Sequence, residues 1–321
     1  MKTAFVFPGQ GSQSIGMMQG YVGDTVVRAT FEEASEILQQ DIWTLVTDGP
    51  ESTLNLTINT QPVMLVADIA IYRAWRKANG TSPAMLAGHS LGEFAALVAA
   101  ETLDFADALQ LVRYRAQVMQ ESVPDGIGGM AAIVGLDDDT VAALCQEVIH
   151  DLPELSLTPA NFNAPGQVVI AGHKTAVLQG ITLAKQNGAK LAVLLPVSIP
   201  SHCSLMREAA DKFSVMLQKT AIKPALIPVL HNVDYALHTA IDDMRHVLEQ
   251  QLYCPVRWTQ TIQTMASHGI THIVECGPGK VLSGLVRRID KNLTSITLSD
   301  IANLQQAITT TGPVQTKHSA G

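Results

Sequence analysis

Apolar residues in the first third of the chain alternate between two spacings. Thr3–Phe7 is a short apolar run that stops at Pro8-Gly9, as a buried strand does before a turn. A helical spacing of three and four follows, at Val27, Phe31, Ala34 and Leu38. A second apolar helix is predicted to start near Pro62 and to end at Asn79-Gly80. Alternating strands and helices predict an α/β fold, in which a central parallel sheet is covered on both faces.

The pattern changes after Gly126. Residues 127–197 are predicted to alternate as β-α-β-β-α-β, the order of a ferredoxin-like domain. The predicted segments are Met130–Leu136, Asp138–His150, Leu155–Asn163, Gln167–Ala171, Thr175–Asn187 and Lys190–Val197. We therefore expect a large α/β domain at 1–126 and 198–310, an inserted small domain at 127–197, and a polar C-terminal tail at 311–321. This arrangement predicts a cleft between the two domains.

An amphipathic helix predicted later in the chain should offer free carbonyl groups at its end. Its apolar positions are Ile241, Met244, Leu248 and Leu252, and the helix should end before Pro255. The last carbonyls of a helix have no partner inside it. Those of Leu248 to Leu252 are therefore expected to be free to accept a hydrogen bond.

Composition and charge narrow the function classes. The chain has 321 residues, 47% of them hydrophobic, and a net charge of −8. It has no long basic run and no apolar stretch of membrane-spanning length, so we expect no nucleic-acid partner, no membrane insertion and a cytoplasmic location. The four cysteines and ten histidines are dispersed without metal-binding spacing, and no metal site is expected.

The strongest chemical candidate is Ser90. It lies in the G-x-S-x-G pentapeptide Gly88–Gly92, between an apolar run and an Ala- and Leu-rich segment of helical composition. In this strand–turn–helix context the pentapeptide is typical of a nucleophile elbow, and the helix directs free N–H groups at the reacting atom. A plain tight turn is the alternative.

His202 is the candidate general base. Pro196 and Pro200 stiffen the chain before it, and an amphipathic helix follows it. A structural or exposed histidine is the alternative.

Two arginines, Arg113 and Arg115, lie on the predicted helix Phe105–Gln120. They are about 200° apart around the helix axis, so they cannot share a face. If one of them points inward, it needs an anionic partner, which is either a structural carboxylate or a substrate.

The ordered motifs of the chain resemble those of the malonyl-CoA:acyl-carrier-protein transacylase family of bacterial type II fatty acid synthesis. The motifs are F-V-F-P-G-Q-G-S-Q at 5–13, Q-P at 61–62, G-H-S-L-G-E at 88–93, the helix of Arg115, N-F-N-x-P-G-Q at 161–167, P-S-H at 200–202, Q-L-Y-x-P-V-x-W at 251–258 and G-P-G-K-V-L at 277–282. The resemblance covers nearly the whole chain. It implies a hydrolase-like large domain with a ferredoxin-like small domain.

The resemblance also implies roles for individual residues. Ser90 would be the acylated nucleophile, His202 its base, and the backbone carbonyl of Gln251 the group that orients the base. The backbone N–H groups of Gln10 and Leu91 would form the oxyanion hole. Arg115 would bind the malonyl carboxylate, and Gln61, His89 and Asn161 would contact the substrate.

The reaction implied is transfer of a malonyl group from malonyl-CoA to holo acyl carrier protein. No bound cofactor is implied, since CoA and phosphopantetheine belong to the substrates, and a monomer is expected. Three alternatives stay open: a transacylase of the same fold in a polyketide or malonate decarboxylase pathway, a serine thioesterase or hydrolase, and an inactive binding module. A hydrolase would need an acid between Ser90 and His202, where Asp137–Asp139 are predicted to be a helix N-cap cluster.

Overall fold

The computed structural model describes residues 2–197 and 199–312. It contains two sheets, and the large domain is built on the first. Its five strands are all parallel, in the order β7-β2-β1-β8-β9. They are β1 (Thr3–Phe7), β2 (Met85–Gly88), β7 (Val229–Leu230), β8 (His272–Glu275) and β9 (Thr294–Thr297).

Alternate residues of the central strand β1 face two separate cores. Phe5 and Phe7 point into the core formed mainly by α1, α4, α5, α6 and α9. Ala4 and Val6 point into a smaller core with α11 and α12. The helices of the large domain are η1 (Gln19–Tyr21), α1 (Thr25–Leu38), α2 (Ile42–Thr47), α3 (Glu51–Leu54), α4 (Thr57–Lys77), α5 (Gly92–Ala99), α6 (Phe105–Ser122), η2 (Ser204–Met206), α9 (Arg207–Lys219), α10 (Ile241–Gln250), α11 (Trp258–Ser267), α12 (Val281–Ile289) and α13 (Ile301–Thr311). The α/β fold with a central parallel sheet is thus confirmed.

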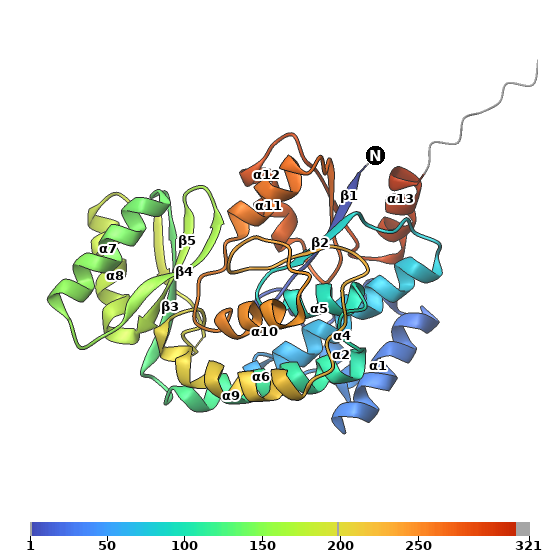
Figure 1. Ribbon diagram of the computed structural model, residues 1–321, viewed down its shortest axis with the longest axis horizontal. Helices are drawn as coiled ribbons and strands as arrows, with labels where there is room; N and C mark the ends of the chain where they lie inside the picture. The colour runs from blue at the N-terminus through green and yellow to red at the C-terminus, as the bar shows by residue number, and fades with distance from the viewer. Residues whose placement is uncertain (1, 198, 313–321) are drawn as a thin grey trace, which may run out of the picture.

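The small domain lies at one end of the molecule, opposite α13 (Figure 1). Its sheet is antiparallel, in the order β4-β5-β3-β6, which is the ferredoxin-like arrangement. The elements are β3 (Gly128–Val134), α7 (Asp138–Asp151), β4 (Leu157–Ala164), β5 (Gln167–His173), α8 (Lys174–Gln186) and β6 (Leu191–Leu194). The two helices cover one face. The other face packs toward the large domain through Met130, Ala160, Val169 and Ala171, against Cys203.

Strand β4 is also hydrogen-bonded to the large domain. The N–H of Phe162 donates to the carbonyl of Val256 at 2.9 Å, and the N–H of Val256 donates to the carbonyl of Ala160 at 2.9 Å. The Thr259 hydroxyl donates to the carbonyl of Phe162 at 3.1 Å. The two domains are therefore joined at the cleft by backbone pairing as well as by the connecting segments.

Several predicted boundaries are wrong; strand β6, for example, ends at Leu194 and not at Val197. Helix α4 begins at Thr57, so Pro62 lies inside it. A proline this close to the N-terminus removes only one backbone hydrogen bond, and burial of α4 outweighs that loss. The predicted polar tail, 311–321, also starts one residue too early, because Thr311 is the last residue of α13 and is buried. Ser198, where the large domain was expected to resume, and residues 313–321 lie outside the described residues.

Several elements had no counterpart in the sequence prediction, among them the short helices α2 and α3. Strand β7 has only two residues, and α11 follows directly after the Q-L-Y-x-P-V-x-W motif. Within residues 2–197 and 199–312, no helix is both long and apolar enough to cross a membrane.

Candidate active site

The turn from β2 into α5 places Ser90 at the carboxyl edge of the sheet. Ser90 has a φ of 52°, in the left-handed region that non-glycine residues seldom adopt. The flanking glycines permit the tight approach: a Cβ at Gly88 would lie 1.8 Å from the carbonyl carbon of Gly92, and a Cβ at Gly92 would lie 2.1 Å from the carbonyl oxygen of Phe7. This close backbone approach, together with the left-handed φ of Ser90, is typical of a strained nucleophile elbow.

His202 lies within hydrogen-bonding distance of this serine. Its Nε2 is 2.8 Å from Ser90 Oγ, and its Nδ1 is 2.7 Å from the backbone carbonyl of Gln251. The carbonyl can only accept, so Nδ1 carries the proton and Nε2 is left to accept the serine proton. His202 itself has a φ of 63°, and its N–H donates to the carbonyl of Leu252 at 2.9 Å. Two carbonyls just after the end of α10 thus hold His202: that of Gln251 accepts from the ring, and that of Leu252 accepts from the backbone N–H.

Burial keeps His202 neutral. Its side chain is 2% exposed, and burial together with the nearby Arg115 cation lowers the pKa of His202 to about 3, although the Gln251 carbonyl acts in the opposite direction. The imidazole is therefore in the basic form across the neutral range, and it is a weak base.

Two backbone donors lie beside Ser90. The N–H of Ser90 is already bonded to Asn232, that of Gly92 to the carbonyl of His89, and that of Glu93 to the carbonyl of Ser90. Among the described residues, the N–H groups of Leu91 and Gln10 have no acceptor. Both residues line the same cavity as Ser90. Their N–H groups are therefore available as donors of the kind that an oxyanion hole requires.

Arg115 points inward from α6 and is 1% exposed. Its Nη1 donates to Gln61 Oε1 at 2.7 Å, and its Nη2 donates to Gln251 Oε1 at 2.8 Å. Nη2 also lies 3.5 Å from Ser90 Oγ. Burial lowers the pKa of Arg115 to about 10, so it remains a cation. Within the described part of the chain, no carboxylate forms a direct ion pair with this guanidinium.

Arg113, two residues earlier, has a different environment. It is half-buried and donates to the carbonyl of Leu38 at 2.7 Å, on the side of α6 that faces α1. The two arginines therefore point in different directions, as their spacing predicts.

The remaining candidates line the cavity with the residues above. Gln61 contacts Arg115, His89 Nε2 lies 2.8 Å from Asn163 Oδ1, and the His89 ring packs edge-on against Trp258. Asn161 is buried on β4, at the cavity wall. Burial lowers the pKa of His89, which is consequently also neutral.

The cavity has a volume of about 250 Å³ and is lined by both domains. The large domain supplies Ser90, His202 and Arg115. The small domain supplies an apolar wall, from Met130, Val169 and Leu195. A cavity of this size, with polar groups at one end, suits a short acyl group.

Sequence reasoning missed three groups at the site. Asn232 follows β7 and bonds to both Ser90 and Gly88, and Glu93 lies in the first turn of α5 with no exposed surface. The Gln251 side chain, assigned no role from the sequence, bonds to both Arg115 and Glu93. A carboxylate inside an otherwise apolar helix was the one available signal, since such a group needs partners when buried.

Among the described residues, no carboxylate is hydrogen-bonded to His202, as the base of such a hydrolase would require. Asp137 accepts the N–H of Thr140 at 2.7 Å, as the N-cap of α7, and the acceptor at His202 is a carbonyl. Within the described ranges, no group of three His, Cys, Asp or Glu side chains is arranged to hold a metal ion. All four cysteines are free thiols.

Comparison with known proteins agrees with this geometry. The family model described as the acyl transferase domain matches residues 4–309. The malonyl CoA-acyl carrier protein transacylase of Escherichia coli (strain K12) is 49% identical, over 95% of this chain and 98% of its own length. The protein of the same name from Bacillus subtilis (strain 168) is 43% identical, over 96% of this chain and 97% of its own length.

Solved structures give the same result. The acyl-carrier-protein S-malonyltransferase of Burkholderia pseudomallei 1710b superposes with a TM-score of 0.94 at 51% identity, over 96% of this chain and 100% of its own. A malonyl-transacylase in complex with a type II PKS acyl-carrier protein also has a TM-score of 0.94, at 45% identity, over 97% of this chain and 100% of its own. This chain therefore belongs to the acyl transferase family, among the malonyl CoA-acyl carrier protein transacylases.

Proposed function

We propose that this protein transfers a malonyl group from malonyl-CoA to the phosphopantetheine thiol of acyl carrier protein, through a malonyl ester on Ser90. One observation carries the proposal: the Ser90 hydroxyl lies between a neutral imidazole, 2.8 Å away, and a buried guanidinium, 3.5 Å away. The imidazole activates the hydroxyl. The guanidinium selects a short acyl group with a carboxylate at its far end.

In the first half-reaction, Ser90 Oγ attacks the thioester carbonyl of malonyl-CoA while Nε2 of His202 takes the hydroxyl proton. The negative charge on the tetrahedral intermediate is stabilised by the N–H groups of Leu91 and Gln10. When the C–S bond breaks, His202 returns the proton to the CoA sulfur. The products are CoA and malonyl-Ser90.

The second half-reaction reverses these roles. The carrier thiol attacks the ester carbonyl, and His202 accepts its proton. The C–Oγ bond then breaks, and the proton moves from His202 to Ser90 Oγ. A thiol is more acidic than water, so a weak base serves it better than it serves hydrolysis.

Arg115 supplies the specificity. In a malonyl group one methylene separates the carboxylate from the reacting carbonyl, which matches a cation close to Ser90 Oγ. Gln61 and Gln251 offer the guanidinium only neutral oxygens, so a substrate carboxylate meets no competing anion there. An acetyl group leaves this buried cation unpaired.

The proposal extends to the location, oligomeric state and pathway of the protein. We propose that the protein acts as a cytoplasmic monomer and supplies malonyl units for fatty acid elongation. The proposed cycle uses no bound cofactor, because the chain and its two substrates supply every group in it. The relative solved with a type II PKS carrier favours a second candidate, malonyl supply to polyketide synthesis.

Incubation with radioactive malonyl-CoA and holo acyl carrier protein tests the function. We expect labelled Ser90 in the absence of carrier, and labelled carrier when it is added. Release of free malonate instead would support a thioesterase. Rates with fatty acid and polyketide carriers compared side by side decide between the two pathways. Ser90→Ala is the matched blank, because it should abolish both labels.

A further inference from the structure

Glu93 is a buried carboxylate behind the active site, with no exposed surface. It lies in the first turn of α5, three residues after Ser90. Its Oε1 lies 2.6 Å from His231 Nδ1, and its Oε2 accepts the Gln251 side-chain amide at 2.7 Å and the Asn232 N–H at 3.3 Å. All three neighbours can act as donors, so both carboxylate oxygens are satisfied as acceptors.

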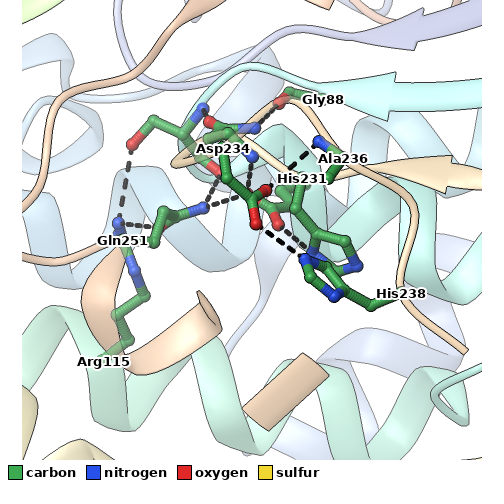
Figure 2. A network of polar contacts seen from close by, with 10 residues as sticks. Gly88, Arg115, His231, Asp234, Ala236, His238 and Gln251 are labelled. Atoms are coloured by element: carbon green, nitrogen blue, oxygen red, sulfur yellow. Dashed lines mark hydrogen bonds and ion pairs between the residues drawn. The ribbon is translucent and has the colours of Figure 1, made fainter. Parts of the chain in front are cut away.

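The Gln251 side chain connects this carboxylate to the site. Its Nε2 donates to Glu93 Oε2 at 2.7 Å and to the carbonyl of Ser90 at 2.9 Å, while its Oε1 accepts from Arg115 Nη2 at 2.8 Å. Figure 2 shows Gln251 between Arg115 on one side and His231 on the other. The donor end of the amide is therefore held by acceptors, and its oxygen is turned toward the guanidinium.

The Gln251 side-chain amide lies between Arg115 and Glu93 and keeps the two charged groups from bonding directly. A carboxylate bonded directly to Arg115 would occupy the N–H groups that a substrate carboxylate needs. Through the amide, Glu93 still supplies a compensating negative charge and opposes the loss of the Arg115 proton on burial. The guanidinium stays oriented, charged and without a competing anion.

We propose that Glu93 is a positioning residue that determines acyl-group specificity: by fixing the Gln251 carboxamide, it orients Arg115 toward the substrate carboxylate. This inference rests on the proposed function. Glu93 touches no substrate, and its effect is relayed through two side chains. Its loss should therefore reduce malonyl transfer far more than acetyl transfer.

Glu93→Met tests the proposal, because methionine keeps the approximate shape and removes both acceptors. We measure kcat/KM for malonyl-CoA and for acetyl-CoA with the same carrier. The ratio of the two should fall by at least ~10-fold, within the range of energies that couple contacting residues. An equal loss for both substrates would overturn the inference, since that is the result of general damage to the elbow.

A double-mutant comparison locates the effect. In an Arg115→Ala background, Glu93→Met should change the ratio by less than about 2-fold, because the side chain that it acts through is gone. A further ~10-fold fall in that background would also overturn the inference. Asp68→Leu is the matched control: Asp68 is another fully buried acidic side chain, its carboxyl oxygens have no hydrogen-bond partner among the described residues, and its replacement should leave the ratio unchanged.

Gln251→Met keeps the test available if Glu93→Met does not fold, as judged by its thermal unfolding. This substitution leaves the backbone carbonyl at His202 and removes the carboxamide. It should lower the ratio as Glu93→Met does, and an unchanged ratio would contradict the relay. The unsubstituted protein tests the proposed function separately. If it transfers no malonyl group at all, the proposed function fails, whereas the ratios test the role of Glu93 alone.

Discussion

Asn232 Oδ1 accepts the backbone N–H of Ser90 at 2.7 Å, and its Nδ2 donates to the carbonyl of Gly88 at 2.6 Å. One side chain, 142 positions later in the sequence than Ser90, thus holds both sides of the elbow. The left-handed φ of Ser90 costs energy, and such a conformation persists only where its surroundings fix it.

Asn232→Ala should therefore misplace the nucleophile. The substitution removes the side-chain partner of the part-buried Ser90 N–H and of the buried Gly88 carbonyl, and we expect the free energy of unfolding to fall by about 1–3 kcal/mol. Acylation of Ser90 by malonyl-CoA should slow on the order of 100-fold, because small displacements of a reacting group are costly. Urea unfolding and single-turnover acylation measure the two effects. Asn187→Ala, at an exposed position, is the control, and full acylation by Asn232→Ala would contradict this role.

Arg115→Ala should remove most of the preference for malonyl-CoA over acetyl-CoA. The penalty for losing the carboxylate's partner is about 2–5 kcal/mol, or roughly 30- to 4000-fold in malonyl kcat/KM. Acetyl transfer should change much less. Arg113→Ala is the matched control on the same helix and should keep the malonyl preference. If malonyl and acetyl transfer fell together in Arg115→Ala, the binding role would be wrong.

Acylation should tolerate acid, because burial lowers the pKa of His202 to about 3. An imidazole with the ordinary value near 6.5 would be only about 3% neutral at pH 5. His202 should remain the free base there, so the single-turnover rate at pH 5 should match that at pH 7. A rate that falls tenfold per pH unit below 6.5 would contradict the lowered pKa. Since the Arg115 cation contributes to the shift, Arg115→Ala should move the acid limb upward.

Asp68 should make the fold less stable as pH rises. It is fully buried, and burial together with the nearby Glu275 raises the pKa of Asp68 well above 3.8. The unfolded chain releases this proton near 3.8 and the folded chain retains it, so stability is lost as pH rises through the folded value. Asp68→Asn cannot ionise, and its gain in the free energy of unfolding should be larger at pH 8 than at pH 5. Urea titrations measure this, with the exposed Glu154→Gln as control. A gain that is equal at both pH values would contradict the assignment.

The sequence predicted the parts of the site that lie in local motifs. The elbow depends on Gly88, Ser90 and Gly92 being adjacent, and the α/β order on the alternation of spacings. The base and its carbonyl partner followed from a family resemblance and from the rule that a helix ends with free carbonyls.

The rest depends on contacts between distant segments. Asn232 follows β7, a strand of two residues that has too short a pattern to be recognised. The Gln251 side chain acquires its role only when α10, α5 and α6 converge. Pro62 was misplaced as a helix start because burial of α4 overrides the local preference of proline.

The backbone pairing of β4 with Val256 has a consequence for how such enzymes diversify. These hydrogen bonds restrain movement of the small domain away from its place beside the cleft, and we infer that the width of the cleft changes little. The size of acyl group admitted then depends on individual wall side chains, such as Met130, Val169 and Leu195. A descendant of this chain can accept a bulkier acyl group by shortening one of them, with no new hinge and no change to the reacting groups.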